Sequence, residues 1–495
     1  MVIVKKSNPS IFELGAARQV TGSTLLIRIG DESHFVDCGI GAFSKIPIEQ
    51  LVLPLKPEDI TSVIVSHAHT DHIFFSPLLY KQGFHGKFYS TPATSDLFKL
   101  QFRQDLSSAF LYNRAIKGKR FTDGPNKGQY IPFKRLPYTS QDLKDMMGLF
   151  PSGNDEKRGI DYGEPFQASE GLKATLFEAG HIPGSAQILL EIKKDGKKIN
   201  ILNACDLGRT DYDTPIVRSP QKDFPVDIDY VVIEATYGDR THAPIEASLK
   251  TLEQSVLDAD KNRGKLVMPA FSMMRTHLLW SFLYDLTRQG RVPDDFMFYS
   301  SSPSADDFTR VMLKYIGEMD QRAQKNLSKK GDNYFDFEKL VHHEKSGETL
   351  DLIESSKDPF GIIAASGMCD HGRVVSILER TIYDPKNIVL LTGYCSPGTR
   401  GDLMMKKTPK ILFESGYVDL RADVRKMGGL SGHADVNEIT SHLKYISKRQ
   451  GKDFKGIFIK HGESEQCDGL KNALIRSGFD KDKVYVMEKG KEYVL

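Results

Sequence analysis

Cysteine is scarce in this chain, which has only five cysteines among 495 residues. No two of them form a C-x-x-C pair, so we expect neither a disulfide framework nor a zinc finger built on paired cysteines. An excess of one charge is also missing, because 67 Lys and Arg face 65 Asp and Glu and leave a formal net charge of +2. This balance excludes a protein that is strongly basic over its whole surface, as many nucleic-acid binders are.

Long apolar runs are missing as well. No stretch approaches the ~18 consecutive apolar residues that a membrane-spanning helix needs. The N-terminal segment MVIVKKSNPS lacks the apolar core of a signal peptide. We therefore expect a cytoplasmic protein with no membrane partner.

Short apolar runs that end at polar residues recur along the chain and indicate strands. Residues 21–30 and 32–39 predict a hairpin that turns at Gly30-Asp31. Between about 240 and 400, a helical spacing at 247–262 alternates with short apolar strands, which predicts a parallel sheet. The fold class is therefore α/β, and the length predicts more than one domain.

One segment is locally basic. Residues 99–135 contain nine Lys and Arg against two Asp, a local net charge of +7. This segment is either a solvated helix and loop or an electrostatic guide for a polyanion. It makes up much of a long insert at about 99–165.

The strongest motif is SHAHTDH at 66–72, which follows a predicted strand and contains His67, His69, Asp71 and His72. Alternate residues of an extended chain point the same way, so His67 and His69 can bind one ion. The chain then turns into a helix, where Asp71 and His72 can face a second ion. Imidazole together with carboxylate suits Zn²⁺, with Mn²⁺ or Fe²⁺ as alternatives.

This H-x-H-x-D-H motif resembles that of the metallo-β-lactamase superfamily. Three further motifs follow the superfamily's pattern: HFVDCG with Asp37, EAGHIPGSA with His181 and NACDLG with Asp206. The resemblance implies an αββα sandwich that binds two zinc ions. It assigns His67, His69 and His181 to one ion, Asp71 and His72 to the other, Asp206 as a bridge, and Asp37 as a residue that orients the metal loop.

Three later motifs resemble the β-CASP nucleases of this superfamily. They are VVIEATYGDRTH with Glu234, GGLSGHADVNE with His433 and IFIKHGE with His461. The resemblance implies that His461 completes the second metal site and that His433 is the general acid for the leaving oxygen. Glu234 would hydrogen-bond to His433 and favour its protonated form, since a nearby carboxylate raises the pKa of a histidine.

The resemblance also implies the domain organisation. A metallo-β-lactamase domain would consist of residues 1–210 and 405–495, and a β-CASP α/β cap would be inserted at 211–404. Four residues of the cap are candidates for substrate binding because they lie in or beside loops at strand ends or helix starts. They are Arg275, Ser302, Ser366 and Arg373.

The expected function is that of a zinc-dependent ribonuclease. It would hydrolyse single-stranded RNA in a cleft between the two domains, with a hydroxide activated by two Zn²⁺ (Mn²⁺ possible) as nucleophile. Both endonuclease and 5′-to-3′ exonuclease activity are compatible with the motifs, and a homodimer is possible. The alternatives are a phosphodiesterase for DNA or small phosphodiesters and a non-catalytic RNA-processing scaffold.

Overall fold

The computed structural model describes residues 8–42, 51, 53–116, 136–151, 159–210 and 216–495. Contacts between α-carbons divide the chain into two compact units. Unit 1 contains the described residues up to 210 together with Val217–Thr241 and Gly432–Leu495, and unit 2 contains His242–Ser431. Among the described residues, no helix is both long and apolar enough to cross a membrane.

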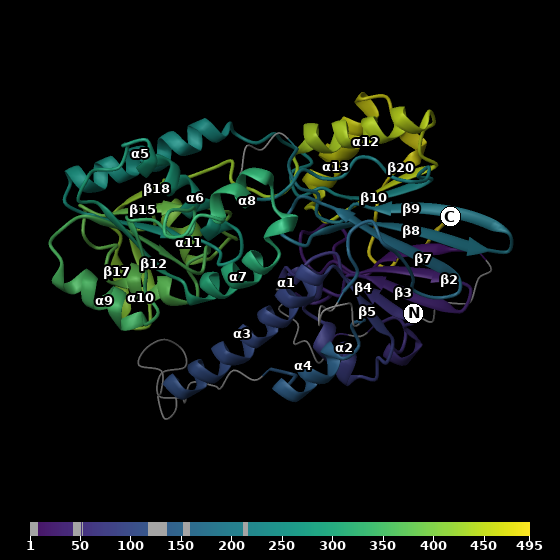
Figure 1. Cartoon of the computed structure of the whole chain (residues 1–495), viewed down its shortest axis with the longest axis horizontal. Helices are drawn as coiled ribbons and strands as arrows, with labels where there is room; N and C mark the ends of the chain where they lie inside the picture. Colours follow the sequence, from purple (N-terminus) through teal and green to yellow (C-terminus); the bar gives the residue numbers. More distant parts are fainter. Residues whose placement is uncertain (1–7, 43–50, 52, 117–135, 152–158, 211–215) are drawn as a thin grey trace. The chain divides into compact units, whose positions relative to one another are not determined.

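The first sheet of unit 1 has six strands in the order β21-β1-β2-β3-β4-β5 (Figure 1). Its strands are β1 (Ser10–Glu13), β2 (Leu25–Ile29), β3 (Glu32–Val36), β4 (Ser62–Ile64), β5 (Lys87–Tyr89) and β21 (Tyr493–Val494). β2 and β3 are antiparallel and form the hairpin predicted from the sequence, with Gly30 in the turn at φ 62°. β3, β4 and β5 run parallel.

The second sheet of unit 1 has seven strands in the order β20-β19-β10-β9-β8-β7-β6. Its strands are β6 (Pro165–Gln167), β7 (Leu172–Glu178), β8 (Ala186–Lys194), β9 (Lys197–Asn203), β10 (Tyr230–Glu234), β19 (Gly456–Lys460) and β20 (Val484–Val486). β8 is antiparallel to both of its neighbours, β7 and β9, whereas β9, β10, β19 and β20 run parallel. The strand that contains Glu234 therefore lies between strands from distant parts of the chain.

The two sheets pack face to face and helices cover their outer faces. Between the sheets, Ile27 and Ile64 of the first sheet share a buried apolar cluster with Ile188 of the second. The opposite face of the second sheet packs on two helices, α12 (Val436–Gln450) and α13 (Ser464–Arg476). Figure 1 shows α1 (Thr70–Ile73), α2 (Ser76–Lys81) and α4 (Ser140–Met147) beside the first sheet. Helix α3 (Pro92–Ile116) packs there near its start, where the ring of Phe98 lies 6.0 Å from that of Phe88 on β5. This is the αββα sandwich expected from the resemblance.

Unit 2 contains a parallel six-stranded sheet in the order β13-β12-β14-β11-β15-β18. Its strands are β11 (Lys265–Pro269), β12 (Met297–Ser301), β13 (Leu340–His342), β14 (Phe360–Ala364), β15 (Ile388–Leu391) and β18 (Asp423–Lys426), and a separate hairpin is formed by β16 (Lys410–Phe413) and β17 (Gly416–Asp419). Its helices are α5 (Ile245–Lys261), α6 (Arg275–Arg288), α7 (Pro303–Lys314), α8 (Gln321–Leu327), α9 (Ser346–Ser355), α10 (Arg373–Glu379) and α11 (Arg400–Met405). In Figure 1, α5 lies on one face of the sheet and α9 and α10 on the other.

Helix α6 contains Trp280, the only tryptophan of the chain. Its side chain is fully buried. The rings around it belong to His277, Phe335 and His342, with centroids 4.9 to 5.8 Å away. All three neighbours belong to unit 2.

Two stretches of the chain belong to a different unit from the one that the expected boundaries at 211 and 405 assign to them. Residues 217–241 belong to unit 1, because β10 pairs with β9 and β19. Residues 405–431 belong to unit 2, because β18 extends the parallel sheet next to β15. Most of the basic segment at 99–135 lies outside the described residues, and only Lys99 and Arg103 of its cations have described side chains.

Candidate metal centre

The candidate ligands of unit 1 follow the carboxyl ends of its strands. The loop after β4 contains His67 and His69 on an extended backbone, and α1 begins immediately afterwards with Asp71 and His72 in its single turn. This turn packs on Gly39, where a Cβ atom would lie 1.6 Å from the carbonyl oxygen of Asp71. Only glycine at this position lets the metal loop approach so closely. The other candidate ligands follow β7 (His181), β9 (Asp206) and β19 (His461).

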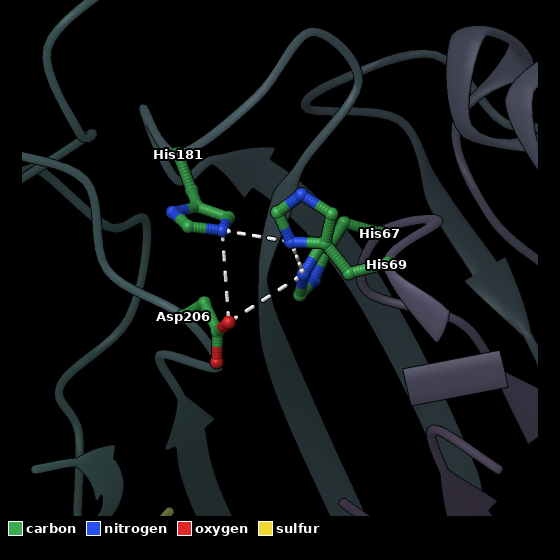
Figure 2. A group of neighbouring side chains, drawn as sticks. All are labelled: His67, His69, His181 and Asp206. Atoms are coloured by element: carbon green, nitrogen blue, oxygen red, sulfur yellow. Dashed lines mark hydrogen bonds and ion pairs between the residues drawn. The ribbon is translucent and has the colours of Figure 1, made fainter. Parts of the chain in front are cut away.

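His67, His69, His181 and Asp206 form the first donor set, and Figure 2 shows their nitrogen and oxygen atoms converging. Nδ1 of His69 lies 3.0 Å from Nε2 of His67 and 3.1 Å from Nε2 of His181. Oδ2 of Asp206 lies 3.5 Å from Nε2 of His67 and 3.6 Å from Nε2 of His181. These spacings are close to the ~3.4 Å that separates nitrogen ligands around a tetrahedral Zn²⁺ with bonds of about 2.1 Å.

Asp71, His72 and His461 form the second donor set. Nε2 of His461 lies 3.3 Å from both Nε2 of His72 and Oδ2 of Asp71. The His461 backbone N–H donates to the carbonyl oxygen of Ala16, and this bond fixes the loop after β19.

Asp206 faces both donor sets with different oxygens. While Oδ2 points to the first set, Oδ1 lies 3.3 Å from Nε2 of His72 and 3.7 Å from Nδ1 of His461. Oδ1 is buried and accepts no hydrogen bond from the described residues. A buried carboxylate oxygen without a donor needs a compensating cation, so the residues present fit a pair of metal ions.

The imidazoles of the first donor set have the neutral state that metal binding requires. Burial lowers the pKa of His67 and His181 well below the ordinary value and that of His69 to about 4. The first set therefore offers lone pairs, not protons, to an ion.

His72 of the second set differs. Although burial opposes it, the carboxylates of Asp206, Asp37 and Asp71 raise its pKa well above the ordinary value, so it would lose a proton when an ion binds. Although burial opposes ionisation, the charge of His72 and the hydrogen bond from His461 hold the pKa of Asp71 at about 2.

Three polar side chains hold the second ring nitrogens of the ligands. Oδ2 of Asp37 accepts a 2.7 Å hydrogen bond from Nδ1 of His72, and Oδ1 accepts one from the backbone N–H of Ser66. The Ser66 hydroxyl lies 3.0 Å from Nδ1 of His67, and the Thr236 hydroxyl lies 3.2 Å from Nδ1 of His461. Each contact orients a ring so that its other nitrogen faces the donor set.

His433 and Glu234 lie beside the first donor set. Nδ1 of His433 is 2.8 and 3.0 Å from the two carboxylate oxygens of Glu234, which is buried at the end of β10. The same carboxylate accepts the backbone N–H groups of Leu207 and Thr236, so its position is fixed. Although burial opposes it, Glu234 raises the pKa of His433 to about 9. This imidazole therefore has a proton to give next to the metal donors.

The four candidate substrate residues lie in unit 2 and are positioned in two ways. Arg275 donates to the carbonyl oxygen of Thr392, and Arg373 donates to the carbonyl oxygens of His343 and Glu344. Both guanidinium groups therefore hold backbone carbonyl groups of neighbouring loops in unit 2. The hydroxyls of Ser302 and Ser366 are buried and lack a hydrogen-bond partner among the described residues.

The motifs do not identify the residues that support the candidate ligands on the side away from the donor sets. Ser66 lies in SHAHTDH and Thr236 in VVIEATYGDRTH. Both could be identified from the requirement that the second ring nitrogen of a ligating histidine has a hydrogen-bond partner. Glu13 and Lys460 form a buried ion pair of 2.9 Å, in which Lys460 directly precedes the ligand His461. No local pattern connects two residues 447 positions apart.

Three family models match consecutive parts of the chain. The metallo-beta-lactamase superfamily model matches residues 17–196, the Beta-Casp domain model residues 276–404, and the model of a Zn-dependent metallo-hydrolase RNA specificity domain residues 417–487. The order of these three matches along the chain agrees with the order of the metallo-β-lactamase and β-CASP motifs.

Related proteins match over almost the whole chain. A ribonuclease of Thermus thermophilus, TTHA0252, is 27% identical over 470 residues that cover 94% of this chain and 96% of that protein. The transcription termination factor FttA of Methanocaldococcus jannaschii is 28% identical and covers 92% of this chain and 67% of its own length. A crystal structure of an Enterococcus faecalis protein of unknown function has a TM-score of 0.50 at 10% identity, covers 99% of this chain and 100% of its own, and supports the fold alone. The motifs, the donor sets and the three domain matches together show that this chain belongs to the β-CASP family of the metallo-β-lactamase superfamily.

Proposed function

We propose that this protein is a zinc-dependent ribonuclease that hydrolyses phosphodiester bonds of single-stranded RNA. The observation that carries the proposal is Asp206, whose two oxygens face two separate donor sets next to the His433–Glu234 pair. The ribonuclease among the relatives and the match to an RNA specificity domain support RNA as substrate. A homodimer, a cytoplasmic location and 5′-to-3′ exonuclease activity stay predictions.

Two zinc ions would be held by the two donor sets, with Asp206 shared between them. When bound, such ions lower the pKa of a water molecule and neutralise charge on the phosphate. The chain keeps His67, His69 and His181 neutral by burial and orients His72 through Asp37. The three histidines of the first set would therefore bind an ion without first losing protons.

His433 would supply the proton that the leaving oxygen needs. Its Nδ1–H is held by the Glu234 carboxylate, which leaves Nε2 as the atom that donates to the leaving alkoxide. Glu234 favours the protonated ring before the reaction and fixes its orientation. A proton held at a defined atom lowers the barrier for breaking the P–O bond.

Substitution of Asp71 and His433 tests the proposal on a labelled single-stranded RNA. Asp71→Ala should lose both cleavage and metal, and chelation of the wild type should have the same effect. His433→Ala should keep its metal content but lose roughly 10²- to 10⁴-fold in turnover, the usual contribution of a general acid. His85→Ala, at an exposed histidine of the same unit, is the matched control and should cleave normally.

The same assay separates the alternatives. Absence of RNA cleavage by the metal-loaded wild type would contradict the proposal and favour a scaffold role. Faster cleavage of single-stranded DNA or of a chromogenic phosphodiester would assign a different substrate to the same donor sets. A 5′-labelled RNA cut at internal positions would indicate an endonuclease, whereas mononucleotides released only from the monophosphate form would indicate a 5′-to-3′ exonuclease.

A further inference from the structure

Two aromatic side chains lie exposed at the carboxyl edge of the unit 2 sheet. Phe271 follows β11 and is 37% exposed, and Tyr394 follows β15 and is 61% exposed. Because β11 and β15 are neighbouring parallel strands, both residues lie at the same edge of the sheet. Exposed aromatic residues at a strand edge have no role in the core of this sheet.

The Phe271 ring lies against two glycines, Gly367 and Gly393, which have no side chains. A Cβ atom at Gly367, after β14, would lie 2.9 and 3.0 Å from two carbons of this ring. A Cβ atom at Gly393, after β15, would lie 3.4 Å from one of the same carbons. The backbone of Phe271 is fixed as well, since its carbonyl oxygen accepts both the N–H and the hydroxyl of Thr276. Two glycines therefore let the ring lie flush with the sheet edge.

Polar groups suited to a nucleotide accompany the rings. Ser366 directly precedes Gly367, and its hydroxyl is buried without a hydrogen-bond partner among the described residues. Lys426 ends β18, the strand next to β15, and its ammonium group is exposed and forms no hydrogen bond or ion pair within the described part of the chain. The cluster thus offers aromatic area, an unused hydroxyl and an uncommitted cation.

We propose that Phe271 and Tyr394 form a stacking platform for the bases of single-stranded RNA. This inference rests on the proposed function and names where unit 2 would hold the substrate. Nucleobases stack on exposed aromatic rings regardless of sequence, while nearby cations contact the phosphates. Lys426 is the residue that would meet the backbone, and the platform would confer little base preference.

Binding of short RNAs to the metal-free full chain tests the platform without cleavage. Phe271→Leu and Tyr394→Leu keep apolar volume but remove the ring, and each should weaken binding on the order of 5- to 150-fold, the effect of losing one stacked base. Both should also abolish the fluorescence quenching of 2-aminopurine placed in the RNA. Phe271→Trp should restore both signals. Tyr417→Leu is the matched control, because Tyr417 is 68% exposed but lies on the β16–β17 hairpin.

An abasic strand of the same length separates stacking from other causes. It keeps the phosphates but has no bases, so the Leu variants should bind it as tightly as the wild type does. Equal loss on the abasic strand, or unchanged binding of normal RNA by both variants, would overturn the platform. Either of these outcomes, found for a wild type that cleaves RNA in the presence of metal, overturns the platform but not the proposed function. If the wild type neither binds nor cleaves RNA, both the proposed function and the platform are overturned.

Discussion

A buried ion pair joins Glu13 and Lys460, which lie near opposite ends of the chain. The ammonium of Lys460 donates to Oε2 of Glu13 at 2.9 Å and to the Ser23 hydroxyl at 2.8 Å. Oε1 of Glu13 accepts the backbone N–H groups of Gly15, Ala16 and Thr24. Since Ala16 in turn accepts the N–H of His461, this ion pair supports the loop of a candidate ligand.

Removal of the lysine alone should therefore be costly. Lys460→Met leaves a buried carboxylate without its partner, and loss of one partner of a buried ion pair typically costs about 3–5 kcal/mol. The double variant Glu13→Gln/Lys460→Met should recover part of this loss, because glutamine is neutral and still accepts N–H bonds. Urea unfolding followed by far-ultraviolet circular dichroism, with hydrogen exchange of β19, measures both. A single variant as stable as the wild type would show that the pair contributes nothing.

At the scale of elements, helix α12 begins in a capping box directly after His433. The Asp435 carboxylate accepts the backbone N–H groups of Asn437 and Glu438, and the Glu438 side chain accepts the N–H of Asp435. Glu438 also accepts the N–H of Thr210, which follows the Asp206 loop. The start of α12 thus connects the general-acid candidate His433 to the loop that contains Asp206.

This arrangement predicts a combined effect on stability and activity. Asp435→Ala should cost about 1 kcal/mol of unfolding free energy, the usual loss for an N-cap. It should also lower kcat more than KM, because His433 lies two positions before the cap. Asp435→Asn keeps the cap and should preserve both values in thermal unfolding and RNA cleavage assays. If the alanine variant keeps the wild-type kcat, the cap does not determine the position of His433.

Local patterns explain which elements could be predicted from the sequence. The β2–β3 hairpin and helix α5 follow from turn residues and helical spacing within 20 residues, and SHAHTDH places four candidate ligands in one loop and turn. The pairing of β10 with β19 and the contact of Lys460 with Glu13 join segments more than 200 positions apart. No periodicity encodes such partners, so the positions of residues 217–241 and 405–431 and the supporting ion pair became visible only in three dimensions.

At the scale of the whole molecule, each unit contains a buried histidine outside the donor sets that is neutral in the folded state. Burial lowers the pKa of His277 in unit 2 and of His442 in unit 1 from 6.5 to about 3. His277 contacts the Thr309 hydroxyl and His442 the Gln187 side chain. Among the described residues, neither ring forms a hydrogen bond to a carboxylate, which would stabilise its protonated form.

Both units should therefore lose stability in mild acid. Between pH 6.5 and 3 the unfolded chain binds a proton at each histidine that the folded chain does not, so the unfolding free energy falls as the pH decreases. From pH 7 to 5 the loss should be about 2 kcal/mol per histidine. Urea titrations at both pH values measure it. His277→Gln/His442→Gln should reduce this dependence. If the double variant loses stability as steeply as the wild type, other groups cause the loss.

The position of the only tryptophan determines how these experiments must be read. Trp280 lies in α6 with only unit 2 rings around it, among them His277. Its intrinsic fluorescence is therefore a spectroscopic label for one half of the molecule, supplied by the natural sequence. Unfolding of unit 2 will therefore change this emission, whereas the loss of metal ions or of Lys460 in unit 1 can leave the emission unchanged while the other unit unfolds.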